Sequence, residues 1–67
     1  MTIEQAIEQE RAQAAAYQID ADNSRGEGRP GAAASLETFA QYHTQLADWL
    51  AEFAELRAAT ARKEEQG

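Results

Sequence analysis

Residues 36–56 decide the fold: they read LETFAQYHTQLADWLAEFAEL and carry eight large apolar side chains at helical spacing. With Leu36 as position a of a heptad, apolar residues recur at positions a, d and g, and alanine occupies every position e. Positions a and d are Leu36, Phe39, His43, Leu46, Leu50, Phe53, Arg57 and Thr60, positions g are Tyr42, Trp49 and Leu56, and positions e are Ala40, Ala47, Ala54 and Ala61. Four of the seven positions are therefore mainly apolar.

The apolar surface of this helix is too wide for a single neighbour. A helix packed against one neighbour has an apolar stripe about 100° wide, whereas positions a, d, e and g together span about half of the circumference or more. Alanine along a whole edge also allows a second backbone to approach closely. We therefore predict two contact faces on this helix.

A first helix is predicted over about residues 3–22. Thr2 and Gln5 have the T-x-x-Q spacing of a capping box, and strong helix formers follow them. One side of this helix carries Ile3, Ile7, Glu10, Ala14, Tyr17 and Ala21, and a weaker stripe of Ala12, Ala15, Ala16 and Ile19 lies nearly opposite. So few large side chains cannot cover the wide apolar surface of the second helix.

Residues 23–34 are predicted to form a flexible loop, because three glycines and a proline interrupt any helix there. Ser35 is the expected N-cap of a second helix over about residues 35–62. An alternative start is also consistent with the sequence, since the three alanines before Ser35 could extend this helix back to Pro30. The polar residues 63–67 are expected to fray.

The predicted fold is all-α: one domain over residues 1–67, built as an antiparallel hairpin of two helices. A chain of 67 residues buries a comparatively small fraction of its surface, and this one has neither cysteines for disulfides nor a metal-ligand cluster. Oligomerisation is the remaining way to stabilise it, so we expect a homodimer that forms a four-helix bundle. The predicted interface residues are Tyr42, Leu46, Trp49, Leu50, Phe53 and Leu56.

Composition excludes several classes of function. The net charge of −6 argues against direct nucleic-acid binding, which depends on lysine and arginine. No apolar stretch approaches the ~20 residues of a membrane span. Residues 1–5 show no basic segment followed by an apolar run, so we expect no signal peptide and a cytoplasmic protein.

Two features of the sequence could carry chemistry. Gly26, Gly28 and Gly31 match G-x-G-x-x-G, but a dinucleotide site needs a preceding strand, so a solvated turn is the favoured interpretation. In the antiparallel hairpin Glu10 lies about one turn from His43, the single histidine. This pair is either a polar contact that fixes the register or a general acid and base, or half of a metal site. We predict neither an enzyme nor a bound cofactor.

The favoured function is that of a non-catalytic interaction module, a homodimeric hairpin that binds and modulates, or inhibits, a larger protein. Its acidic helix face suits a partner with a basic surface. In size and style, though through no motif, the chain resembles small accessory proteins of bacteriophages and mobile elements. The alternatives are a structural subunit or coiled-coil adaptor in a larger complex, and a small site around Glu10 and His43. The predicted acidic face consists of Glu37, Asp48, Glu52 and Glu55.

Overall fold

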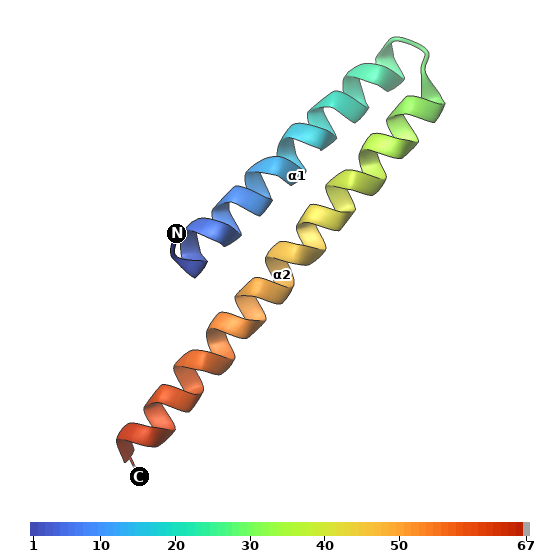
Figure 1. Ribbon diagram of the computed structural model, residues 1–67. Coiled ribbons are helices and arrows are strands. Elements are labelled where there is room, and N and C mark those ends of the chain that lie inside the picture. The colour runs from blue at the N-terminus through green and yellow to red at the C-terminus, as the bar shows by residue number, and fades with distance from the viewer. Residues whose placement is uncertain (67) are drawn as a thin grey trace.

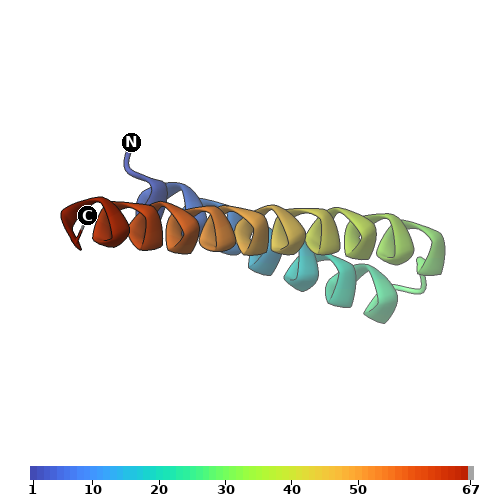
Figure 2. The same cartoon turned by 90° about the horizontal axis from the view of Figure 1, so that it is seen from below.

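The computed structural model describes residues 1–66, which form the predicted antiparallel hairpin of two helices (Figure 1). Helix α1 spans Ile3–Gly26 and helix α2 spans Pro30–Gln66. The hairpin is a narrow rod of 60 × 17 × 12 Å. Seen from below, α1 crosses α2 at a shallow angle (Figure 2).

The predicted capping box starts α1. The backbone N–H of Gln5 donates to the Thr2 hydroxyl at 3.1 Å, and the Thr2 N–H donates to the Gln5 side-chain oxygen at 2.8 Å. These two bonds satisfy donors that have no partner within the first turn of a helix. The T-x-x-Q motif therefore predicts the helix start correctly.

The connection between the helices is shorter than the predicted loop of residues 23–34. Only residues 27–29 lie between the two helices. Gly28 adopts the left-handed conformation, with φ of 78°, and Arg29 N–H donates to the Ser24 carbonyl at 2.8 Å. This pattern is a Schellman motif, which needs one left-handed residue and therefore one glycine. The other two glycines of the predicted loop, Gly26 and Gly31, lie within the helices.

Helix α2 starts at Pro30, so the prediction of Ser35 as its N-cap is wrong and the alternative start is correct. Proline suits the first position of a helix, where its fixed φ is favourable and its missing N–H would have no partner. At the other end α2 continues to Gln66 instead of ending near residue 62. Residues 57–66 contain no glycine or proline to end it. The last residue of the predicted frayed tail, Gly67, lies outside the described residues.

Alanine forms the seam between the helices. The buried apolar residues are Ala14, Ala21, Ala33, Ala40 and Ala47. Each helix contributes alanines at intervals of seven residues, and no large side chain of the described chain is fully buried. Because only α1 covers α2, these buried alanines mark the face of α2 that contacts α1. Small side chains let the two backbones approach closely, and the three-residue connection suits closely spaced helices.

Helix α2 extends well beyond the start of α1, as the unequal predicted lengths require (Figure 1). Its 37 residues correspond to roughly 55 Å, against roughly 36 Å for the 24 residues of α1. The last turns of α2 therefore have no neighbour within the described hairpin.

Candidate functional site

The apolar residues of α2 fall on two faces, as the width of its apolar surface predicts. The buried alanines at positions e form one face, against α1. At 100° per residue, the middle of positions d and g lies about 130° around the helix from positions e. The large side chains at d and g consequently point away from the seam.

We call the residues at these d and g positions the apolar row: Phe39, Tyr42, Leu46, Trp49, Phe53 and Leu56. Five of them expose between 51% and 67% of their surface, and Leu46 is half-buried. Because these residues recur at intervals of three and four, they form one apolar stripe along α2. Monomeric proteins rarely leave an apolar patch of this kind uncovered unless it is an interaction site.

The apolar row contains all but one of the predicted interface residues. Leu50 is the exception: it is half-buried at position a, between the alanine seam and the row. Phe39 belongs to the row although it was not among the predicted interface residues, and 51% of its surface is exposed. Its position d, shared with Leu46 and Phe53, was the signal for it in the sequence.

An aromatic cluster joins one end of the row to α1. Tyr17 of α1 stacks on His43 with ring centres 5.4 Å apart, and it lies 5.5 Å from the ring of Phe39. Tyr42 meets His43 edge to face at 5.5 Å. Together with Thr38 these rings line a shallow apolar pocket. The cluster fixes the rotation of α2 relative to α1 and so helps to orient the row.

Glu10 and His43 are in direct contact. The Oε2 atom of Glu10 lies 2.5 Å from Nδ1 of His43, and the two side chains are 26% and 20% exposed. Within residues 1–66 no third side chain of a metal-binding type joins Glu10 and His43 in a group that could hold a metal ion. The pair on its own offers two ligands, fewer than a zinc site uses. Its position between the helices suits a contact that fixes the register.

The predicted acidic face is divided in the structure. Asp48, Glu52 and Glu55 are exposed, and Asp48 lines a shallow pocket beside α1. Glu37 is half-buried and forms an ion pair with Arg25 across the hairpin, near the turn. Three of the four predicted carboxylates are therefore exposed to a partner.

The glycine motif does not form a phosphate-binding loop of the dinucleotide type. It is divided between the end of α1, the turn and the start of α2, and the described part of the chain contains no strand. Only Gly28 has a positive φ, which the turn itself requires. The solvated turn is thus the interpretation that the geometry supports.

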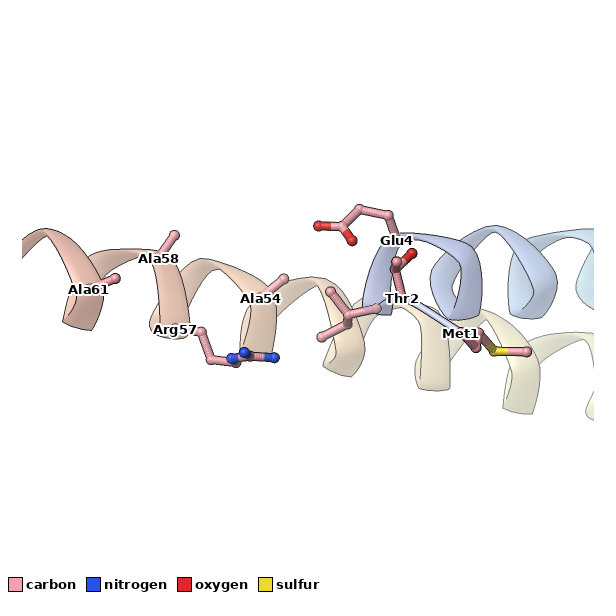
Figure 3. Close-up of a pocket in the computed structure, with 8 residues that line it drawn as sticks. Met1, Thr2, Glu4, Ala54, Arg57, Ala58 and Ala61 are labelled. Atoms are coloured by element: carbon pink, nitrogen blue, oxygen red, sulfur yellow. The ribbon is translucent and has the colours of Figure 1, made fainter.

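An open groove lies where α1 begins alongside α2 (Figure 3). The first residues of α1 form one wall, and Ala54, Ala58 and Ala61 of α2 form the floor beyond them. Ala54 and Ala61 continue the heptad of the buried alanines at and beyond the N-terminus of α1. The seam that holds the hairpin is thus longer than the helix that covers it.

Comparison of the chain with models of protein families, with curated proteins and with solved structures found no match. Neither described helix carries an apolar stretch long enough to cross a membrane. The evidence on function is therefore the surface of the hairpin itself. It defines a two-helix hairpin that is closed by alanine and bears an uncovered row of large apolar side chains.

Proposed function

We propose that the protein is a non-catalytic interaction module that binds and modulates another protein through the apolar row. The observation behind this proposal is the division of α2 into two faces. The hairpin closes on small residues, while side chains such as Trp49 and Phe53 stay more than half exposed. Aromatic side chains of this kind are the usual anchors of protein interfaces.

The form of the row suits recognition by another helix. Its residues recur at intervals of three and four along nearly five turns of α2. An amphipathic helix or a groove between helices offers complementary holes at this spacing. The exposed carboxylates Asp48, Glu52 and Glu55 flank the row on one side and favour a partner with basic residues at the rim.

Quantitative affinity capture from cells that express the protein tests this proposal. The double variant Phe53→Gln/Leu56→Gln removes apolar surface from the row without adding charge. We expect it to lose a specific protein that the wild-type chain captures. A matched control is Gln41→Ala, which changes an exposed residue of the same helix at position f, outside the row.

A third variant separates the row from the acidic face. Glu52→Gln/Glu55→Gln removes two carboxylates and leaves the row intact, so we expect it to keep the partner with weaker, less salt-sensitive binding. Loss of the partner in this variant, with full retention in Phe53→Gln/Leu56→Gln, would place the contact on the acidic face and overturn the proposal. The activity of the captured partner, measured with and without the purified chain, then shows whether the chain inhibits or activates it.

A second candidate function is a subunit or coiled-coil adaptor of a larger assembly. The overhang of α2 supports it, because Ala61 continues the heptad of the seam, with Ala58 beside it in the open groove (Figure 3). A helix from another molecule inserted there would produce open-ended association. Light scattering over a range of concentrations distinguishes the two, since open-ended or partner-dependent assembly favours this candidate and a stable closed dimer favours the first.

A further inference from the structure

We propose that a second copy of this chain covers the apolar row, with the two α2 helices antiparallel about a two-fold axis midway between Leu46 and Trp49. This inference rests on the proposed function in one respect: it takes the row as the contact surface. It adds that a second copy occupies the row first, in a defined register, so that a partner protein binds the row by displacing that copy.

The area of the row matches what a stable dimer needs. An aromatic side chain has about 150–250 Å² to bury, so the exposed halves of the five exposed row residues amount to roughly 500 Å² per chain. Two rows packed together bury roughly 1,000 Å² before any rim is counted, close to the lower limit of about 1,200 Å² for specific interfaces. A second copy therefore buries the ~1,000 Å² that a specific interface has to clear, and the rim adds to this area.

The spacing of the row allows it to pair with itself. A two-fold interface requires that residue i contacts residue j and that j contacts i in return. Reading from Phe39 to Leu56, the intervals are three, four, three, four and three, which are the same in both directions. About the proposed axis every row residue meets a row residue of the other copy, and none is left without a partner. The layers are Phe39 with Leu56, Tyr42 with Phe53, and Leu46 with Trp49.

The antiparallel arrangement packs these layers more evenly than a parallel one. Each antiparallel layer joins one position d with one position g, so the largest residue, Trp49, faces a leucine. A parallel pair would place Trp49 against Trp49 and Leu46 against Leu46, which gives layers of very different volume. Close-packed interiors disfavour such uneven layers because they leave voids or force strain.

The helix dipoles favour the antiparallel arrangement, whereas one ion pair favours the parallel arrangement. Antiparallel neighbours oppose their helix dipoles favourably, whereas parallel neighbours bring like ends together. A parallel pair would gain an ion pair between Arg57 of one copy and Glu52 of the other. Exposed ion pairs contribute little to association. Packing therefore decides the arrangement in favour of the antiparallel pair.

Sedimentation equilibrium of the full chain tests the occupant. We expect a dimer that does not grow further with concentration. Trp49→Glu places two carboxylates at the central layer, and we expect it to raise the dimer dissociation constant at least tenfold. Gln41→Glu adds the same charge on the far side of α2, and we expect it to change that constant less than threefold. A wild-type chain that is monomeric at all concentrations would overturn the proposal.

Cross-linking tests the register, and it remains informative if Trp49→Glu fails to fold. The chain has no cysteine, so Phe39→Cys and Leu56→Cys each introduce the only thiol. In the antiparallel pair two copies of Phe39→Cys hold their thiols about 25 Å apart along the helices. We expect a short bis-maleimide to link mixtures of the two variants and neither variant alone. Links within each single variant, or none in the mixture, would overturn the antiparallel arrangement.

The outcome for the second copy is distinguishable from the outcome for the proposed function. A monomeric chain that still loses its captured protein in Phe53→Gln/Leu56→Gln overturns the dimer and leaves the proposed function in place. A dimer of the predicted register with no such loss overturns the proposed function, because the row then serves self-association alone.

Discussion

Replacing Ala47 with leucine tests whether alanine really closes the hairpin. Ala47 lies at position e in the middle of the seam, and only 1% of its surface is exposed. A larger side chain there has to push α1 away from α2 or adopt a strained rotamer. Large apolar side chains, which stabilise a conventional core, should therefore destabilise the hairpin at this position.

The expected cost follows from overpacking. Inserting methylene groups into a well-packed site typically costs about 1–3 kcal/mol, and leucine has nearly the same helix propensity as alanine, so propensity adds little. For a domain of this size each kcal/mol lowers the melting temperature by roughly 4–8 °C. We therefore expect Ala47→Leu to melt roughly 5–20 °C below the wild-type chain.

Circular dichroism at matched protein concentrations measures this shift; matching matters because self-association makes the melting temperature depend on concentration. Ala59→Leu is the control, because Ala59 is an exposed residue of the same helix and lies beyond the covered part of the seam. We expect the control to melt within a few degrees of the wild-type chain. If Ala47→Leu melts at or above the temperature of Ala59→Leu, the alanine seam does not hold the hairpin.

Three further predictions concern the ends of the helices and the contact between them. Gly28→Ala should lower the free energy of unfolding by about 1 kcal/mol because of the left-handed backbone, while Gly31→Ala should raise it in the same urea titration. Thr2→Ala should cost about 1 kcal/mol and increase amide exchange in the first turn of α1, and unchanged exchange there would contradict the cap. A double-mutant cycle of Glu10→Gln and His43→Gln should give a coupling energy of about 1 kcal/mol, and additive effects would show that the contact does not stabilise the hairpin.

Local sequence signals predicted the helices well but not the length of their connection. The T-x-x-Q motif at Thr2 specifies a helix start through two hydrogen bonds among neighbours, so it can be recognised without tertiary information. The three glycines and Pro30, taken together, predict a loop over residues 23–34. In the structure only Gly28 needs a left-handed conformation, and Pro30 starts a helix. Composition alone does not say which glycine in a cluster ends a helix.

The candidate surface could be predicted only in part, because the sequence does not say which apolar face of α2 meets α1. Large side chains at d and g offer more buried area, whereas alanine at e offers closer approach. A connection of three residues favours close helices, and its length emerged only from the structure. The spacing therefore predicts five of the six row residues as interface residues, but it does not predict that Phe39 is exposed.

The fluorescence of Trp49, the single tryptophan, tests the central claim most directly, because it reports whether the apolar row is covered by another chain. Emission wavelength and acrylamide quenching are recorded from dilute to concentrated protein, with helicity followed in the same samples. We expect Trp49 to be shielded from quencher in concentrated solution and to become accessible on dilution as the dimer dissociates. A fully helical chain in which Trp49 stays open to quencher at the highest concentration would contradict the claim.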